Sequence, residues 1–409
     1  MAQVAVIGAG IVGLSCAFHL AGDGHAVTMF DPDPDGDRCS WGNAGGIAVT
    51  EVAPAAIPGV LWRVPGWLLD PLGPLALRPA HAPAMLPWLA AFVRAGRATH
   101  VERIAAALGG LLGRVYDDLC PMLDALGIAG DLRRVGALTV YGSAAAFRRD
   151  AAEWDLKRRL GIDCRDVSGA EARALEPALG ANVAVGMFTP AWSQVADPKA
   201  VWAALSAAAR ARGVRIEAQA VRDLRRPGRV RLASGVEAAC DVVVLAAGAW
   251  SAALARDAGD RVLLESERGY NVTLPAPGVA LSREVVFAER KFVAAPLAPG
   301  LRIGGGAEFA GLRAPAHYAR ARTLARLAAD YLPGLSLAGG TEWMGQRPTT
   351  PDTLPVLGRS PRRADVIHAF GHGHLGLTLA ATTGRIVADL VAGRPTPDLS
   401  AFSAARFVR

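Results

Sequence analysis

The sequence has few cysteines and no cysteine pair. Only 5 of its 409 residues are cysteine, and they stand far apart, at Cys16, Cys39, Cys120, Cys164 and Cys240. Without a Cys-x-x-Cys pair, this spacing argues against both a disulfide framework and a zinc site. It is typical of reduced thiols in a cytosolic protein.

Segments that would direct the chain into or across a membrane are also lacking. A strand-like apolar run starts at Val4, which leaves no room before it for a secretory signal. No apolar run approaches the roughly 18–20 residues of a membrane-spanning helix. We therefore expect a cytoplasmic protein, and peripheral attachment to the inner face of the cell membrane stays open.

Charge of either sign is not concentrated. Lys and Arg number 44 against 37 Asp and Glu, a net charge of +7, and the arginine-rich excess is spread along the chain. Nucleic-acid binding would need a clustered basic face with aromatic side chains for stacking, and the sequence has no such cluster. Apolar residues make up 52%, which suits a large core shared by two closely associated domains.

The first thirty-one residues predict a dinucleotide-binding unit. A strand at 4–7 is followed by a Gly-x-Gly-x-x-Gly turn, a helix, and a second strand that ends in Asp31. The first glycine makes the tight turn, the second admits a pyrophosphate to the helix N-terminus, and the third allows close helix–strand packing. An acid at 31 suits a ribose diol and argues against a 2′-phosphate. The residues expected at the cofactor are Gly8, Gly10, Ile11, Val12, Gly13 and Asp31.

Three later stretches are expected to reach the same cofactor. Residues 40–46 are rich in glycine, residues 241–248 form an apolar strand that ends in glycine, and 371–376 turn into a closing helix at 377–391. Small residues let a chain run close against a flat ligand. The carboxyl ends of buried parallel strands are also where such ligands bind.

The segment 53–93 combines many large apolar residues with many prolines. Proline at this density prevents one long helix. The segment is either the internal packing of a cap domain or an exposed apolar face for a membrane or a lipid-soluble quinone, for which residues 58–93 are the candidates. Other expected elements are helices at 104–126 (broken or kinked at Pro121), 144–160, 198–212 and 316–331, strands at 137–141 and 366–370, and an antiparallel sheet within 263–332.

Together these stretches resemble the FAD-dependent D-amino acid oxidase superfamily, and within it the D-amino acid dehydrogenase small subunits. The likeness covers nearly the whole chain. It implies an α/β fold, with a Rossmann-like FAD domain of the glutathione-reductase type and an inserted α+β substrate or cap domain built on an antiparallel sheet. The expected division is 1–52, 191–258 and 341–409 for the FAD domain, and 53–190 and 259–340 for the cap domain.

The resemblance further implies which residues hold FAD. Beyond the first glycine turn they are Ser40, Asn43, Ala44, Gly45, Gly46, Val221, Ala247, Gly248, Trp250, Gly373, His374, Leu375, Gly376, Leu377 and Thr378. Some relatives attach FAD through a cysteine in the segment that corresponds to 345–352. No cysteine follows Cys240, so we expect non-covalent FAD, and no ligand spacing near the histidines suggests a metal.

By the same resemblance, the segment 345–352 places Arg347 over the flavin, where its guanidinium would grip a substrate carboxylate at two points. A surface salt bridge is the alternative for this arginine. Tyr270 is a candidate for closing the site or bonding the carboxylate, and a packed tyrosine is the alternative. His372 and His374 lie at the flavin-facing turn; either could bond the ring or shape the site without being catalytic.

The implied activity is oxidation of a D-amino acid, or a D-proline-type imino acid, with hydride passing to FAD and electrons then passing to a quinone. Two alternatives stay open. One is a glycine- or sarcosine-type amine oxidase that uses oxygen. The other is a flavin subunit that only relays electrons within a complex.

Overall fold

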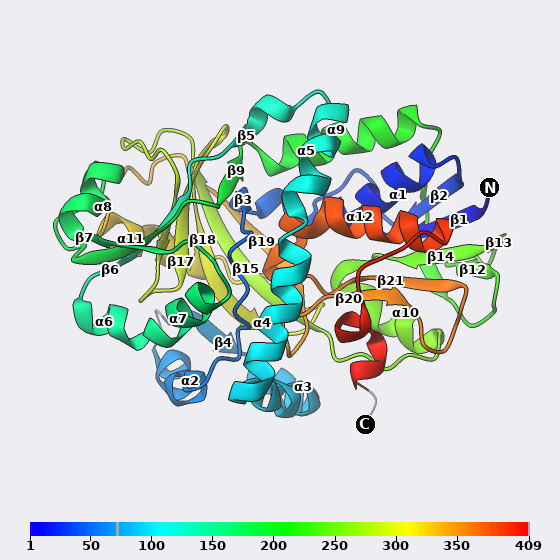
Figure 1. Cartoon of the computed structure of the whole chain (residues 1–409), viewed down its shortest axis with the longest axis horizontal. Coiled ribbons are helices and arrows are strands. Elements are labelled where there is room, and N and C mark those ends of the chain that lie inside the picture. Colours follow the sequence, from blue (N-terminus) through cyan, green and yellow to red (C-terminus); the bar gives the residue numbers. More distant parts are fainter. Residues whose placement is uncertain (71–72, 408–409) are drawn as a thin grey trace.

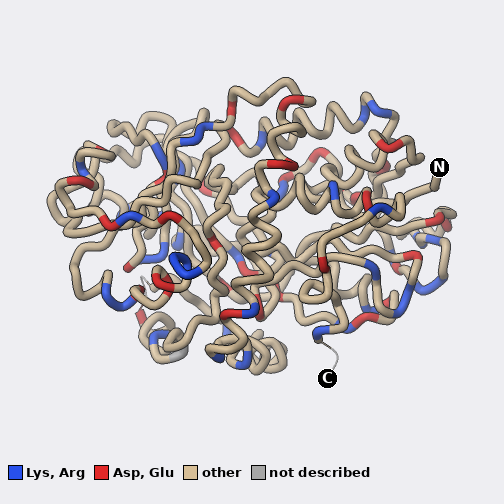
Figure 2. Tube along the Cα trace, viewed as in Figure 1, with Lys and Arg blue, Asp and Glu red and all other residues tan. Residues whose placement is uncertain are grey.

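The computed structural model describes residues 1–70 and 73–407 and arranges them around two large sheets (Figure 1). Residues 71–72, within the candidate membrane segment, and 408–409 lie outside the described residues. Lys and Arg are interspersed with Asp and Glu along the whole trace (Figure 2). The excess positive charge is therefore shared by many elements.

One sheet has six strands and is parallel except at one edge. Its middle strands carry the apolar runs of the sequence, which suit burial on both faces. The expected strand at 366–370 is confirmed as β21. In spatial order the strands are β10 (Arg215–Ala218), β2 (Ala26–Asp31), β1 (Gln3–Ile7), β14 (Val242–Leu245), β21 (Val366–Phe370) and the antiparallel β20 (Val356–Arg359).

The two faces of this sheet bury different partners. Alternate residues of β1 point to opposite sides: Val4 and Val6 belong to one hydrophobic core, Ala5 and Ile7 to another. The first core is covered by α1 (Ile11–Gly22), α9 (Pro198–Ala211) and α12 (Gly376–Ala392). The second is covered by α10 (Ser251–Asp257) and a small antiparallel sheet of β11 (Val221–Asp223), β12 (Arg229–Leu232) and β13 (Glu237–Ala239).

The second large sheet has nine strands and is mostly antiparallel, as expected for the cap domain. Only the β16–β6 and β18–β4 pairs are parallel. One face packs on α11 (Ala319–Ala329) and on α8 (Gly169–Leu175), whose expected capping box forms between Ser168 and Glu171. The order is β19 (Thr341–Thr349), β15 (Glu265–Leu274), β18 (Gly300–Phe309), β17 (Phe292–Leu297), β16 (Glu284–Phe287), β6 (Ala137–Tyr141), β8 (Val185–Thr189) and β7 (Arg165–Ser168), with β4 (Leu75–Leu77) on β18.

The strand β19 departs from the expected domain division. Residues 341–409 were assigned to the FAD domain, yet β19 pairs with β15 along its whole length and is an edge strand of the nine-stranded sheet. This boundary is therefore wrong by about one strand, because strand pairing and not sequence position decides the sheet. The rest of the division stays a prediction.

Several elements connect the six-stranded sheet and its helices with the nine-stranded sheet. A three-stranded sheet of β3 (Gly46–Ile47), β9 (Ser193–Val195) and β5 (Leu132–Arg133) holds the end of the second glycine-rich stretch. Helices α4 (Ala98–Leu112) and α5 (Val115–Ala125) run between these two parts and pack on α12 (Figure 1). The proline-rich segment forms α2 (Val60–Leu69) and α3 (Ala82–Ala95), two short helices as proline predicts.

The expected helix at 104–126 breaks in a different place from the one predicted. The chain interrupts at Gly113 and Arg114, between α4 and α5, whereas Pro121 lies inside α5. The expected helix at 144–160 is likewise divided at Asp150 into α6 (Ala144–Arg149) and α7 (Ala151–Arg159). Gly113 is itself a poor helix former, and at the second break the side chain of Asp150 accepts hydrogen bonds from Arg63 and Tyr141.

The closing helix contradicts one expectation drawn from hydropathy. Among the described residues, Gly373–Ala392 is long and apolar enough to cross a membrane by length and composition. However, 72% of its apolar window is buried inside the protein. It lies beside α1 (Figure 1), and its apolar side chains belong to the core on one face of the parallel sheet.

The contact between α1 and α12 predicts a strict need for glycine at 384. A Cβ there would lie 2.7 Å from the backbone carbonyl oxygen of Ser15, so Gly384→Ala should lower the free energy of unfolding by about 1–3 kcal/mol through overpacking. The matched control is Gly110→Ala on the exposed side of α4, where a Cβ meets nothing within 4 Å. The control should raise the free energy of unfolding by about 0.5–1 kcal/mol. Urea unfolding would measure both, and equal effects would contradict the assigned contact.

Candidate active site

Four of the predicted cofactor stretches meet at one edge of the parallel sheet. The first glycine turn follows β1, Asp31 ends β2, residues 247–250 follow β14, and residues 371–376 follow β21. Because these strands are parallel and adjacent, their carboxyl ends share an edge. Both α1 and α12 therefore begin at this edge, side by side (Figure 1).

The first glycine turn has the geometry that its sequence predicts. Gly8 has a φ of +103°, and a Cβ there would lie 2.5 Å from the carbonyl oxygen of Ala246. A Cβ on Gly13 would overlap the carbonyl oxygen of Gly8. At Gly10, the N-cap of α1, nothing lies within 4 Å, and no capping side chain or acid occupies the first turn. Open space at a free helix N-terminus suits a pyrophosphate.

Asp31 is held by the protein. Its Oδ2 accepts a hydrogen bond from the backbone of Ala9 at 2.8 Å, and its Oδ1 accepts from Asp33 N at 2.9 Å and Arg38 Nη2 at 3.2 Å. The carboxylate thus braces the glycine turn. Its contact with a ribose stays a prediction. The pairing with Arg38 was not anticipated from the sequence.

The second glycine-rich stretch lies between the two large sheets. Thr378, in the first turn of α12, accepts a hydrogen bond from Ala48 N at 3.0 Å and donates to the carbonyl oxygen of Gly46 at 3.4 Å. From the other side, Arg302 of β18 donates to the carbonyl oxygen of Asn43 at 2.6 Å. Residues 40–46 are therefore anchored both to the parallel-sheet half and to the nine-stranded sheet.

Buried polar atoms without a hydrogen-bond partner gather around this stretch. Within the described part of the chain, they include Arg38 Nε, Trp41 Nε1, Trp192 Nε1, Asn271 Oδ1 and Glu284 Oε2. Asn271 donates to the carbonyl oxygen of Gly42, and both Trp192 and Glu284 approach Gly46. Unpaired buried polar groups are costly and rare. Their concentration here, together with the open N-termini of α1 and α12, fits a polar cofactor along these residues.

The other predicted cofactor residues take the positions expected from the strand ends, and their contacts with FAD stay predictions. Val221 begins β11, Ala247 precedes a short 3₁₀ turn at Gly248–Trp250, and Trp250 is 55% exposed. A second 3₁₀ turn, Gly373–Leu375, leads into α12. The remaining predicted residues lie at the helix starts, Ile11, Val12, Gly376 and Leu377, and in the stretch that follows β2, Ser40, Ala44 and Gly45.

Arg347 lies in a cluster of charges at the other end of the candidate site. Its Nη1 donates to Glu267 Oε1 at 2.8 Å, and the same oxygen accepts from His374 Nε2 at 2.8 Å. Thr349 donates to Glu267 Oε2 at 3.2 Å. Burial opposes ionisation of Glu267, but His374 and Arg347 outweigh it and lower the pKa of this carboxyl to about 2. Glu267 is therefore a carboxylate throughout the working pH range.

The guanidinium of Arg347 lies flat across the sheet and presents one free edge. Its Nη1 also donates to the carbonyl oxygen of Gly306 at 2.9 Å. The group covers Gly269, where a Cβ would lie 2.8 Å from Nε. In residues 1–70 and 73–407, no hydrogen bond or ion pair reaches Nε or Nη2, and the side chain is 20% exposed. The Nε–Nη2 edge is the fork that binds a carboxylate at two points.

Tyr270 and His372 are both turned away from this cluster. Tyr270 is buried, its hydroxyl donates to Glu308, and it accepts a hydrogen bond from His317 N at 3.1 Å. His372 is buried with its Nε2 2.9 Å from Thr383 Oγ1, and burial lowers its pKa to about 4. These placements favour the packing role that the sequence left open for Tyr270 and a structural role for His372.

Sequence reasoning assigned no role to two residues of the cluster, Glu267 and Cys39. Glu267 is in direct register with Arg347 across β15 and β19, which a single sequence does not reveal. Burial raises the pKa of the Cys39 thiol to about 11 even though the residue is exposed by surface area, and Arg347 and Glu267 both influence it. Among the described residues no group of three or more His, Cys, Asp or Glu could hold a metal.

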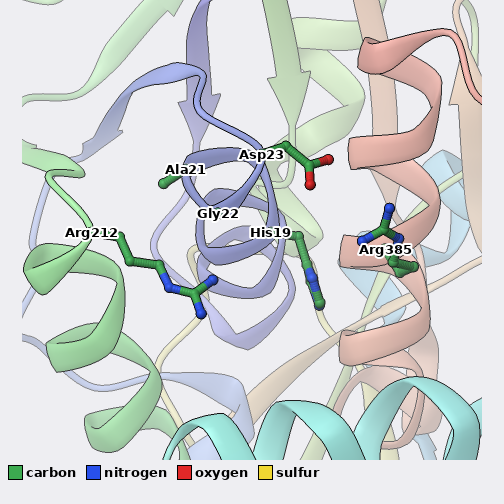
Figure 3. A pocket seen from close by; sticks show the side chains of 6 residues that line it. All are labelled: His19, Ala21, Gly22, Asp23, Arg212 and Arg385. Carbon is green, nitrogen blue, oxygen red and sulfur yellow. The ribbon is translucent and has the colours of Figure 1, made fainter.

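A surface hollow lies elsewhere, away from this cluster. It has a volume of about 530 Å³ and is lined by His19, Ala21, Gly22, Asp23, Arg212 and Arg385 (Figure 3). His19 stands between the two arginines, and burial with these charges lowers its pKa to about 4. The hollow is at the C-terminal end of α1, opposite the glycine turn, so it is separate from the candidate active site.

Comparison with known proteins identifies the family. The model of the DAO family, described as FAD dependent oxidoreductase, matches residues 3–390. The chain belongs to this family. FAD is accordingly its cofactor, and the α/β fold with a Rossmann-like FAD domain is confirmed.

Individual family members match over their whole length. The chain is 36% identical to a D-amino-acid oxidase of Bradyrhizobium diazoefficiens, covering 99% of each chain. It is 33% identical to D-amino acid dehydrogenase 2 of Ralstonia nicotianae, over 96% of this chain and 97% of the other. Among solved structures, glycine oxidase from Geobacillus kaustophilus superposes with a TM-score of 0.73 at 25% identity, covering 99% of each.

The buried carboxyl of Glu284 leads us to predict how the free energy of unfolding depends on pH. Burial, and then the nearby Glu51, raises the pKa of this carboxyl to about 8, against roughly 4.3 for an unfolded chain. The folded state therefore favours the protonated acid, and stability should decline as pH rises from below 5 through 8. Glu284→Gln should flatten this decline in urea unfolding at pH 5, 7 and 9. Glu342→Gln, at the exposed start of β19, is the control and should keep the original slope. Parallel curves for all three proteins would refute the assignment.

Proposed function

We propose that the chain oxidises D-amino acids, including D-proline-type imino acids, to the corresponding imino acids. The observation that supports this best is the free Nε–Nη2 edge of Arg347, fixed by Glu267 and Gly306. The named activities of the relatives in Bradyrhizobium and Ralstonia agree with it. Non-covalent FAD is part of the proposal, since no cysteine follows Cys240.

In this proposal, residues of the chain bind the substrate and orient it toward the cofactor. FAD, when bound, supplies the acceptor for the hydride that leaves the substrate Cα. The fork of Arg347 would take the substrate carboxylate in two charge-assisted hydrogen bonds and so fix which hydrogen faces the acceptor. The neutral amine would become an iminium as the hydride departs, and this imino acid would then react with water to give a 2-oxo acid and ammonia, or stay as a cyclic imine.

We further propose that electrons leave to a quinone-type acceptor at a membrane surface. The support is a set of exposed apolar side chains on α2 and α3, two helices that both lie along the lower side of the molecule in Figure 1. The large ones among them are Trp62, Leu68, Leu69, Leu86 and Val93. Trp62 is 90% exposed and Leu69 83% exposed. Arg94 and Arg97 are exposed at the end of α3, where they suit anionic lipid headgroups.

Replacing Arg347 tests the proposed carboxylate grip. Arg347→Ala should lower kcat/KM for a good D-amino acid by about 2–5 kcal/mol, roughly 30- to 5,000-fold, the cost of truncating a buried charge partner. Arg347→Lys should recover only part, because an ammonium lacks the planar fork. Arg322→Ala, which breaks an exposed pair with Glu342, is the control and should stay within twofold. Unchanged turnover in Arg347→Ala would exclude the grip.

One series of measurements can identify both the substrate class and the electron acceptor. Flavin bleaching without oxygen, across D-, L- and N-methyl amino acids, should occur with D-amino or D-imino acids. Bleaching by glycine or sarcosine alone would favour the amine-oxidase alternative, and no bleaching without a partner protein would favour an electron-relay subunit. Turnover with a quinone but little peroxide in air should then identify a dehydrogenase.

The exposed apolar side chains of α2 and α3 predict binding to anionic vesicles. Trp62→Ser combined with Leu69→Ser should reduce co-sedimentation with vesicles of phosphatidylglycerol and phosphatidylcholine at least fivefold, because the largest exposed apolar areas are lost. Activity with a soluble dye should stay unchanged. The control is Val236→Ser, which removes an apolar side chain that is 60% exposed between β12 and β13. Equal sedimentation of all three proteins would contradict a membrane role for these side chains.

A further inference from the structure

Among the residues that the structure describes, Glu267 is the carboxylate shared by Arg347 and the turn that precedes α12. It projects from β15, while Arg347 and Thr349 come from β19 and His374 comes from the turn before α12. A single oxygen, Oε1, accepts from both Arg347 and His374 at 2.8 Å. The Glu267 side chain is only 9% exposed, so these protein groups, and not water, are its main partners.

The protein holds Nη1 of Arg347 and leaves the edge formed by Nε and Nη2 free for a ligand. Nη1 is held between Glu267 and the carbonyl oxygen of Gly306, and the plane of the group lies on Gly269. A free arginine side chain loses much rotamer freedom when it binds a ligand. Here that freedom is already lost before any ligand arrives, which is the condition for tight and well-aimed binding.

We infer that Glu267 is a positioning residue, which orients the Arg347 fork for the substrate carboxylate and couples it through His374 to the turn that precedes α12. The inference rests on the proposed function. It assigns to this buried carboxylate an organising role, although its negative charge would by itself repel a carboxylate ligand. Positioning and repulsion predict opposite effects of removing the charge, and this makes the assignment testable.

The test compares Glu267→Gln with Glu265→Gln in the flavin-loaded protein. Glu265 is two residues earlier on β15 and is also paired with a histidine, His81, at 2.9 Å, so it controls for the general loss of an ion pair. Propionate, a carboxylate without an amine, is titrated while flavin absorbance is followed. Glu267→Gln should weaken propionate binding at least tenfold, and the propionate affinity of Glu265→Gln should stay within twofold of that of the unchanged protein. Unchanged or tighter propionate binding in Glu267→Gln would overturn the inference.

Steady-state kinetics give a second and independent readout. Misplacing a group that binds substrate and transition state alike raises KM more than it lowers kcat. Glu267→Gln should therefore raise KM for a good D-amino acid at least tenfold with a smaller change in kcat, and Glu267→Asp should recover part of the loss. A fall in kcat alone, with KM unchanged, would overturn the positioning role.

A double-mutant cycle separates this inference from the proposed function. If Glu267 acts through Arg347, Glu267→Gln should cost little further kcat/KM once Arg347→Ala is present. Full additivity would overturn the inference. If Arg347→Ala itself is harmless, the proposed function fails. If Arg347→Ala is severe while Glu267→Gln is harmless, only the positioning role fails. If Glu267→Gln does not retain flavin, His374→Asn is the second variant, because it removes the other hydrogen-bond donor to Glu267 Oε1. His374→Asn should weaken propionate binding at least threefold. Unchanged propionate binding would count against the coupling.

Discussion

The close crossing of α1 and α12 is the constraint on which the rest of the structure depends. Gly384 allows α12 to approach the backbone of Ser15, and both helices begin at the carboxyl edge of the parallel sheet. Neither helix has a capping side chain or an acid in its first turn. Two sets of free backbone N–H groups therefore lie at one edge, where an extended dinucleotide with charged and polar groups can meet both.

The nine-stranded sheet completes the site through a few polar links to that edge. Arg302 reaches Asn43, and Glu267 reaches His374. Each link joins a residue of the sheet to a segment next to one of the helix starts. The proposed substrate end of the site is thereby built from strands, and the predicted cofactor end from helix termini. Rigid elements of this kind hold side chains more accurately than loops do.

Much of this architecture was readable from the sequence because its signals are local. The glycine turn at 8–13, the proline-led α9 and the apolar β21 each carry their pattern within a few residues. The partner of Arg347 could not be predicted, since it depends on the register between β15 and β19. For the same reason the sequence did not predict that residues 341–349 pair with β15, and placed them in the FAD domain.

The two histidines His372 and His374 show that the sequence cannot predict the direction of individual side chains within one turn. His372 and His374 are two residues apart in one glycine-rich turn, and the sequence gives no way to choose between them. The 3₁₀ turn at Gly373–Leu375 sends them in different directions, His372 to Thr383 within α12 and His374 to Glu267. Pro121 is similar, because the break that it predicted is made instead at Gly113.

The position of β21 and α12 has a consequence for synthesis of the chain. β21 pairs with β14, and α12 covers the face shared with α1, yet both come from the last 44 of the 409 residues. The sheet stays incomplete until β21 and α12, at residues 366–392, have been made. Long-range parallel pairing is slow to form, and at roughly 5–20 residues per second an unfinished chain waits many seconds with an open strand edge. The edge of β14 therefore stays unpaired for longer than it would if its partner strand followed it directly in the sequence.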